Sequence, residues 1–346
     1  MAEKKNREYE KLKSDLAAGT PGGIYIFYGE ETYLREHYLR ELQKKLVPPA
    51  VEDFNLHRFS GKTSIYEIAE AAEAMPMMSE RTLVVAADFD LYKMSEDQRG
   101  RFIELAENFP PYCCLVFVYD LIDYKPNKTY KKLYAAIEKN VQAVCFEMQE
   151  RGALVNWIAR RFRAAGQEID ARTAEHLIFT CGAMMTGLLP EIEKISAYAR
   201  GRSITKEDID AVAEPILDAV VFDMTGAITR GDYDRASELL GQLFKKQEEP
   251  IMLLAVIGKE LRRIYTARIA LDEGRDRYWL MEVWKMRSDY PARLAMDAAR
   301  KVTREWCRES VRLCAELDLR MKSEKGFDSE GELKLFLMRL AQGVRG

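Results

Sequence analysis

Short apolar runs, rich in β-branched and aromatic residues, alternate with amphipathic stretches over the first 147 residues. The runs are Ile24–Tyr28, Leu56–Phe59, Thr82–Ala86, Cys114–Tyr119 and Val141–Phe146. After the first run, Leu34, Tyr38 and Leu42 recur every four residues, as one face of a helix requires. Five buried strands separated by four helices predict a parallel sheet with helices on both faces.

Two helix starts are indicated by their capping residues. Ser64 is followed three positions later by Glu67, and Thr205 is followed by Asp208 at the same spacing. A hydroxyl at the N-cap and a carboxylate at the third helical position each bond a free backbone N–H group. We therefore expect helices to begin directly after Ser64 and Thr205.

Beyond Glu147 the strand pattern stops, and the remaining apolar residues follow a helical spacing. The predicted helices are Ala153–Ala165, Ala171–Cys181, Leu188–Arg200, Ile216–Thr229, Tyr233–Lys245, Ile251–Leu271, Ala292–Cys314 and Glu330–Gln342. The pattern predicts an α/β domain over residues 1–147, a small helical domain over 148–214 and a second helical domain over 215–346.

The composition excludes several classes of protein. With 47% apolar and 32% charged residues, the chain has enough apolar side chains to build folded cores. Its apolar runs are too short to cross a membrane, and the charged segment Met1–Lys13 lacks the apolar core of a signal peptide. Six cysteines without a CxxC pair and only three histidines indicate reduced thiols, no metal site and a cytoplasmic protein.

Charge is distributed unevenly along the chain, whose formal net charge is −3. The segment from Gly258 to Gly346 contains 20 basic and 15 acidic residues, a net of +5, whereas residues 1–257 carry a net of −8. This asymmetry indicates either different partners for the two ends or simply a solvated helical surface, and both interpretations stay open.

The turn after the first predicted strand is where a nucleotide-binding parallel sheet would hold phosphates. A P-loop requires GxxxxGK[ST], whereas the turn from Gly29 to Leu34 reads GEETYL, without a second glycine or a lysine. Its two carboxylates suit a helix N-terminus and would repel a triphosphate. We therefore expect no nucleotide cofactor at this turn.

Two aspartates, Asp120 and Asp123, follow the fourth apolar run. We interpret them as loop and capping residues. No combination of side chains typical of a catalytic site stands out.

Three methionines and a proline occupy a turn that ought to be polar. Met75, Pro76, Met77 and Met78 lie between the second predicted helix and the third predicted strand. Methionine is flexible and polarisable, and it recurs on adaptable binding surfaces. From composition alone, two interpretations stay open: the side chains pack beneath the edge of the sheet, or they contact a partner.

Six segments, in order along nearly the whole chain, carry a family resemblance. They are Ile24–Arg35, Met75–Val85, Pro190–Ala199, Ile204–Ile209, Val221–Asp223 and Glu316–Gly326. Their residues resemble those of the δ subunit of the bacterial DNA polymerase III clamp loader. Met75–Val85 (MPMMSERTLVV) fits that family's small or proline residue, two bulky apolar residues, polar turn with arginine and apolar strand.

The resemblance implies an AAA+-like architecture. Residues 1–147 would form a RecA-like α/β domain, 148–214 a helical lid domain and 215–346 a C-terminal helical collar domain. It also implies a function: the δ subunit binds the β sliding clamp and opens it for loading onto primed DNA during replication, without hydrolysing ATP itself. The chain would thus be a non-catalytic subunit of a DNA-directed DNA polymerase, which is a nucleotidyltransferase holoenzyme.

The implied partners are the β sliding clamp, the γ/τ ATPase and δ′ subunits of the clamp loader, and primer–template DNA in the assembled complex, with no membrane. On the family's pattern, Met77 and Met78 are the clamp-binding residues, with Pro76 and Arg81 beside them. Burial of each methionine in a clamp pocket would contribute about 1.5–3 kcal/mol before the costs of association.

Three basic residues near the C-terminus are DNA-proximal candidates. Arg320, Lys322 and Lys325 are expected in a loop before the last predicted helix, where they could neutralise phosphates. Some relatives place an aromatic residue just before the glycine of this loop. Here Lys325 precedes Gly326 and Phe327 follows it, so the chain departs from the family pattern on which a stacking role rests.

Two other function classes stay open. A nucleotide-binding AAA+ ATPase with an unusual loop would bind ATP as an isolated chain. A helical scaffold of another assembly would have no clamp partner, so co-purification with a ring-shaped clamp separates it from the δ-like function.

Overall fold

The computed structural model describes residues 2–286 and 288–343. The chain divides into two compact units, which are described separately. The first contains the residues up to Gln149 together with Met184–Thr186, and the second contains Glu150–Ala183 and the residues from Gly187 onward. The finer division of the helical part at 214/215 stays a prediction.

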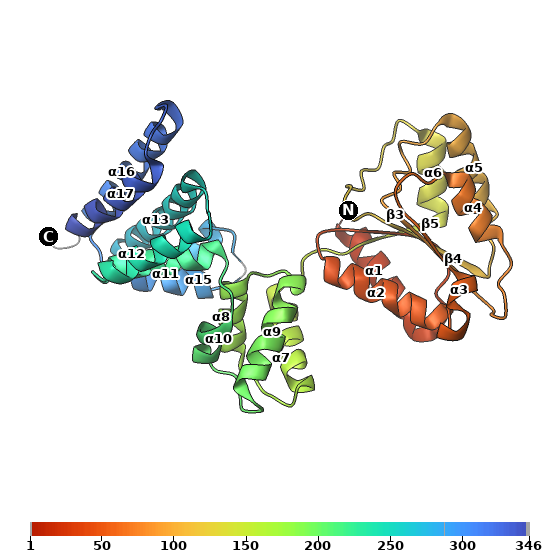
Figure 1. Ribbon diagram of the computed structural model, residues 1–346, viewed down its shortest axis with the longest axis horizontal. Coiled ribbons are helices and arrows are strands. Elements are labelled where there is room, and N and C mark those ends of the chain that lie inside the picture. The colour runs from red at the N-terminus through yellow and green to blue at the C-terminus, as the bar shows by residue number, and fades with distance from the viewer. Residues whose placement is uncertain (1, 287, 344–346) are drawn as a thin grey trace. The chain divides into compact units, whose positions relative to one another are not determined.

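A five-stranded, entirely parallel sheet forms the centre of the first unit (Figure 1). The strands are β1 (Gly23–Tyr28), β2 (Leu56–Phe59), β3 (Thr82–Ala87), β4 (Cys113–Val118) and β5 (Val141–Cys145), in the spatial order β2-β3-β4-β1-β5. All five predicted strands are confirmed. Strand β1 lies between β4 and β5, with Ile26 opposite Phe117 on one side and Ala143 on the other.

Successive side chains of each strand point to opposite faces of the sheet, so a core forms on each face. Ile24 and Ile26 of β1 point into a core that is closed by helices α4, α5 and α6, whereas Phe27 packs against Phe146 on the opposite face. Figure 1 shows α1 and α2 on that opposite side of the sheet. Both faces are therefore covered by helices, as the uninterrupted apolar strands predicted.

Four helices of the first unit, α2, α4, α5 and α6, are the four that were predicted, whereas α1, η1 and α3 were not predicted. Their bounds are α1 (Ala2–Ala18), α2 (Thr32–Leu46), η1 (Pro49–Val51, a 3₁₀ turn), α3 (Glu52–Asn55), α4 (Ile65–Glu73), α5 (Glu96–Glu107) and α6 (Lys131–Asn140). The Ser64–Glu67 capping box at the start of α4 is confirmed. Helix α1 was not predicted, because its sequence is largely polar and its buried Leu12 is covered only once the helix packs beside β5.

The second unit is helical. Its helices are α7 (Arg151–Ala164), α8 (Ala171–Cys181), α9 (Met185–Ala199), α10 (Lys206–Val212), α11 (Leu217–Thr229), α12 (Tyr233–Lys245), α13 (Pro250–Asp272), α14 (Arg277–Val283), α15 (Tyr290–Ala299), α16 (Arg304–Ser323) and α17 (Ser329–Gly343). Thr205 and Asp208 form the predicted capping box at the start of α10. The long helix α13 packs against α11, α15 and α16, and their apolar faces form one continuous core.

Two predictions about the C-terminal helices were wrong. The single helix predicted over Ala292–Cys314 is two helices, α15 and α16, because the chain turns at Arg300–Thr303 and starts again with Thr303 as N-cap. The Thr303 hydroxyl accepts a hydrogen bond from the Trp306 N–H at 3.1 Å. Helix α16 then continues to Ser323, so it includes Arg320 and Lys322, which were expected in a loop.

The structure also bears on membrane-spanning helices and on the cysteines. None of the helices in the described residues is both long enough and apolar enough to cross a membrane. All six cysteines are free thiols, and burial raises the pKa of Cys181 to about 12.

Candidate functional site

The methionine turn, residues 74–81 between α4 and β3, holds its apolar side chains in solvent. Met75, Met77 and Met78 expose 75%, 56% and 88% of their surface. These values contradict the interpretation that the methionines pack beneath the edge of the sheet. The turn therefore exposes a group of adaptable apolar side chains, the kind of surface on which partners bind.

The backbone of the methionine turn is tied to the preceding part of the chain. The Asn55 side chain donates to the Met77 carbonyl oxygen at 2.7 Å and accepts from the Met77 N–H at 2.8 Å. The next residue, Met78, has a left-handed backbone with φ of +54°. Sequence reasoning missed Asn55 because it lies 22 positions before Met77 and belongs to no local pattern.

Arg81 closes the other end of the turn. Its guanidinium donates to the carbonyl oxygen of Pro21 at 3.0 Å, and its backbone is bonded by the Ser79 hydroxyl. Arg81 is half-buried in this position. The structure thus gives Arg81 an orienting contact within the first unit, and Pro76 lies half-buried between two exposed methionines.

The turn between β1 and α2 lies at the carboxyl edge of the sheet, where parallel α/β folds bind ligands. This turn is fixed by the residue that follows β5: the Glu31 N–H donates to the carbonyl oxygen of Phe146 at 2.9 Å. Gly29 has φ of +118°, and a Cβ there would collide with the same carbonyl. The backbone N–H of Glu31, which in a P-loop would be free for phosphate, is therefore already bonded.

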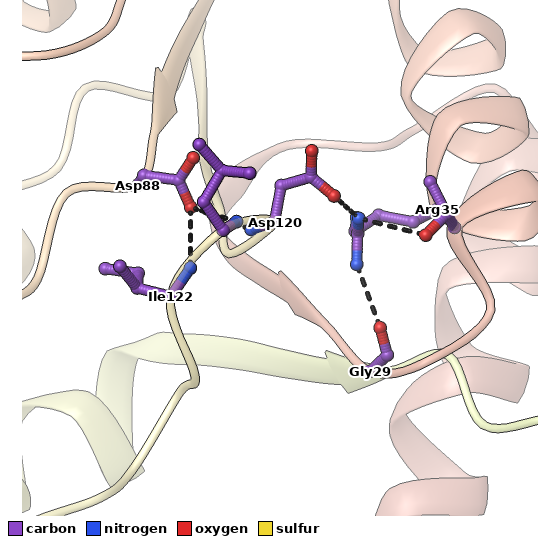
Figure 2. A network of polar contacts seen from close by, with 7 residues as sticks. Gly29, Arg35, Asp88, Asp120 and Ile122 are labelled. Carbon is purple, nitrogen blue, oxygen red and sulfur yellow. Dashed lines mark hydrogen bonds and ion pairs between the residues drawn. The ribbon is translucent and has the colours of Figure 1, made fainter. Parts of the chain in front are cut away.

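Arg35 fills the space beside this turn (Figure 2). The guanidinium is buried, donates to the Gly29 carbonyl oxygen at 2.9 Å and forms an ion pair with Asp120, which follows β4. Glu31, also buried, has a pKa raised by the loss of solvation. The carboxyl edge at β1 and β4 is thus occupied by the chain's own side chains.

Asp88, which follows β3, binds backbone groups. One carboxylate oxygen accepts from the N–H groups of Asp120, Leu121 and Ile122 at 2.9, 2.8 and 3.2 Å (Figure 2). Asp123 pairs with Lys125 at 2.7 Å. These contacts give Asp120 and Asp123 the loop roles that the sequence indicated. Across residues 2–286 and 288–343, no cluster of three or more His, Cys, Asp or Glu could hold a metal.

The three DNA-proximal candidates lie at or just beyond the C-terminal end of α16, and they differ in their contacts. Arg320 pairs with Glu332 at 3.0 Å and lies over the Phe327 ring at 4.7 Å. Lys322 pairs with Asp318 at 2.7 Å. Lys325 is exposed in the turn between α16 and α17, the position in which all three were expected.

The parallel five-stranded sheet covered by helices, followed by a helical second unit, defines an AAA+-like protein. Comparison with known sequences identifies its family. The model of the DNA polymerase III delta subunit matches residues 25–147, and that of its C-terminal domain matches residues 218–340. The chain belongs to the DNA polymerase III delta-subunit family.

Individual relatives agree with this assignment. The chain is 26% identical over 335 residues to DNA polymerase III subunit delta of Bacillus subtilis (strain 168), with 94% of each chain covered. It is 20% identical over 271 residues to the probable DNA polymerase III subunit delta of Aquifex aeolicus (strain VF5), covering 75% of this chain and 74% of the relative. The solved structure of a Bacillus subtilis DNA clamp loader delta protein has the same fold, with a TM-score of 0.53, 23% identity, and coverage of 96% of this chain and 99% of that one.

Proposed function

We propose that this chain binds a ring-shaped β sliding clamp through Met77 and Met78 and opens the ring for loading onto primed DNA during replication. One observation carries the proposal: both side chains project into solvent from a turn whose backbone is hydrogen-bonded in place. Well-anchored apolar side chains of this kind dominate the affinity of many protein interfaces. The likeness to a solved clamp loader delta protein supports a sliding clamp as the partner.

Opening follows from a difference in affinity. A ring exists in closed and open forms, and a protein that binds the open form more tightly shifts the population toward it by no more than that difference. Burial of the two methionines supplies about 1.5–3 kcal/mol each before association costs. Pro76 shapes the turn and Arg81 orients it.

Surface plasmon resonance with immobilised clamp tests the anchors. We expect Met77→Ala/Met78→Ala to weaken binding at least tenfold, which is about 1.4 kcal/mol. The matched control is Met252→Ala/Met338→Ala, which removes two methionines that are 56% and 62% exposed in the second unit. Unchanged affinity of the Met77→Ala/Met78→Ala protein would overturn the anchor assignment.

We also propose that the chain does its work without hydrolysing ATP, as a non-catalytic subunit. The supporting contacts are those of Arg35 with Gly29 and Asp120, and of the Glu31 N–H with Phe146, which occupy the region a triphosphate would need. Filter binding of labelled ATP to the isolated chain tests this, with a P-loop ATPase as positive control. Saturable binding at micromolar ATP would contradict it.

The proposed partners in the loader are the γ/τ ATPase and δ′ subunits in the cytoplasm. Residues 148–214 act as the lid and 215–346 as the collar through which the subunits assemble. Leu335 and Met338, exposed on one face of α17, support an assembly surface there. Size-exclusion chromatography of the reconstituted subunits tests it, because Leu335→Ser/Met338→Ser should release this chain while leaving its clamp affinity unchanged.

In the assembled complex, Arg320, Lys322 and Lys325 are proposed to lie near primer–template DNA. Arg320 has two acidic partners, Glu324 and Glu332, whereas among the described residues Lys322 pairs with Asp318 alone. Lys322→Gln/Lys325→Gln therefore disturbs fewer internal ion pairs. Loss of two phosphate contacts should lower the salt dependence of DNA binding by roughly two units of slope. An unchanged slope would remove both lysines from the DNA-binding surface.

A further inference from the structure

Asn55 is a buried polar side chain whose bonding capacity is used mainly on one distant residue. The side chain is fully buried at the end of the short helix α3. Its amide nitrogen donates to the carbonyl oxygens of Met77, at 2.7 Å, and Val51, at 3.0 Å, and its oxygen accepts from the Met77 N–H at 2.8 Å. Both amide hydrogens and the oxygen are therefore satisfied.

The two bonds to Met77 imitate those of a neighbouring strand. A backbone residue in a sheet exchanges an N–H and a C=O with its partner, and here the Asn55 amide supplies both. Residues 74–81 form neither helix nor strand, so these bonds replace the secondary structure that the turn lacks. Because the Met77 backbone is used inward, its side chain is left to point outward.

We propose that Asn55 is a positioning residue for the methionine turn: it holds the Met77 backbone so that Met77 and Met78 are presented in one fixed arrangement. The inference rests on the proposed clamp-binding function. A loop that is already ordered loses less conformational freedom on binding, and its affinity is higher for that reason. Asn55 touches no partner itself and acts through the turn.

The position of α3 explains why an asparagine fits here. The helix ends directly before β2, and β2 pairs with β3, the strand that follows the methionine turn. Asn55 therefore connects the start of β2 to the methionine turn, which leads into the neighbouring strand β3. Aspartate has nearly the same shape but lacks the N–H donors, and it would place a negative oxygen against two carbonyl groups.

Amide hydrogen exchange tests the positioning directly. In Asn55→Ala we expect the Met77 amide to exchange at least tenfold faster, because it loses its only bonded acceptor among the described contacts. Asn108→Ala is the matched control, since Asn108 bonds a carbonyl of its own helix, α5, away from the turn. Unchanged protection of the Met77 amide in folded Asn55→Ala protein overturns the proposal.

Clamp affinity tests the functional consequence. We expect Asn55→Ala and Asn55→Asp to weaken clamp binding about tenfold, and Asn55→Ala to change affinity less than twofold when Met77→Ala/Met78→Ala is already present. A general structural defect would instead weaken binding equally in both backgrounds, and that result overturns the positioning role. Circular dichroism confirms folding of each variant, and Asn55→Ser, a small uncharged substitution that cannot make both bonds to Met77, serves if Asn55→Ala is unstable.

The two experiments separate the inference from the function on which it rests. If the Met77 amide loses protection in Asn55→Ala but Met77→Ala/Met78→Ala still binds the clamp normally, the positioning of the turn is supported and the assignment of Met77 and Met78 as clamp anchors is overturned. If Met77→Ala/Met78→Ala loses affinity and Asn55→Ala retains both affinity and protection, the function is supported and the positioning is overturned.

Discussion

The guanidinium of Arg35 donates a hydrogen bond to the carbonyl oxygen of Gly29 at 2.9 Å. The donor and the acceptor lie six residues apart, on either side of the turn that begins α2. The same guanidinium pairs with Asp120 after β4, so one buried cation joins the carboxyl ends of β1 and β4. A parallel sheet that leaves this edge open usually holds a ligand there, and here a protein side chain takes that position.

Loss of Arg35 should therefore lower the stability of the first unit. Arg35→Ala leaves the Gly29 carbonyl and the Asp120 carboxylate without their donor, and we expect a decrease of about 1–3 kcal/mol in the free energy of unfolding. Urea denaturation followed by circular dichroism measures it. Arg40→Ala, which removes an exposed pair with Glu36 on the same helix, should cost less than about 0.5 kcal/mol. Equal effects of the two substitutions would contradict the structural role of Arg35.

The strands and the methionine turn could be predicted from the sequence because each is a local pattern. Buried parallel strands appear as short apolar runs, and three methionines stand out in a turn that should be polar. The break between α15 and α16 could not be predicted, because Arg300–Thr303 contains neither glycine nor proline and apolar residues continue on both sides. Only the packing of the two helices shows where the chain turns.

Contacts between residues far apart in the chain could not be predicted from the sequence for a different reason. Asn55 and Met77, or Arg35 and Asp120, meet only because the sheet places their segments side by side. A single polar residue has no periodicity, so nothing in the sequence distinguishes a buried asparagine or arginine from an exposed one. The methionine turn could therefore be singled out from the sequence, whereas the polar residues that hold it could not.

A buried histidine joins three helices of the second unit. His176 of α8 lies with Nε2 2.6 Å from an Asp210 oxygen of α10 and Nδ1 2.9 Å from the Tyr290 hydroxyl of α15. Because a carboxylate can only accept, Nε2 carries the proton that it donates, and in the neutral ring Nδ1 accepts from the Tyr290 O–H. The hydroxyl therefore satisfies a nitrogen that is otherwise sealed from water.

Tyr290→Phe should destabilise the second unit by about 1–2 kcal/mol, because it leaves Nδ1 of His176 buried without a partner. Urea denaturation measures the change, and Tyr278→Phe, at a site 60% exposed, should change stability by less than about 0.5 kcal/mol. His176→Leu combined with Tyr290→Phe should cost less than the sum of the single substitutions, since the polar pair is then removed together. Additive costs would show that the two side chains are not coupled.

Asp208 makes the stability of the second unit depend on pH. Hydrogen bonding from Arg202, with further bonds from Thr205 at the start of α10, lowers the pKa of Asp208 from 3.8 to about 2. A carboxyl group whose pKa is lower in the folded state stabilises the fold fully above its unfolded pKa. That contribution is lost as the pH falls from about 4 toward 2, where the folded-state carboxylate is protonated.

Urea denaturation between pH 2 and pH 6 compares the natural protein with Asp208→Asn. As the pH falls from about 4 to 2 the two should approach each other in stability, and between pH 5 and 6 the natural protein should be the more stable by a constant amount. Arg202→Gln, which removes the main cause of the lowered pKa while keeping the carboxyl group, should flatten the same part of the curve. Parallel curves for the natural protein and Asp208→Asn across the whole range would show that Asp208 titrates alike in the folded and unfolded chains, and that the Arg202 contact does not stabilise its charge.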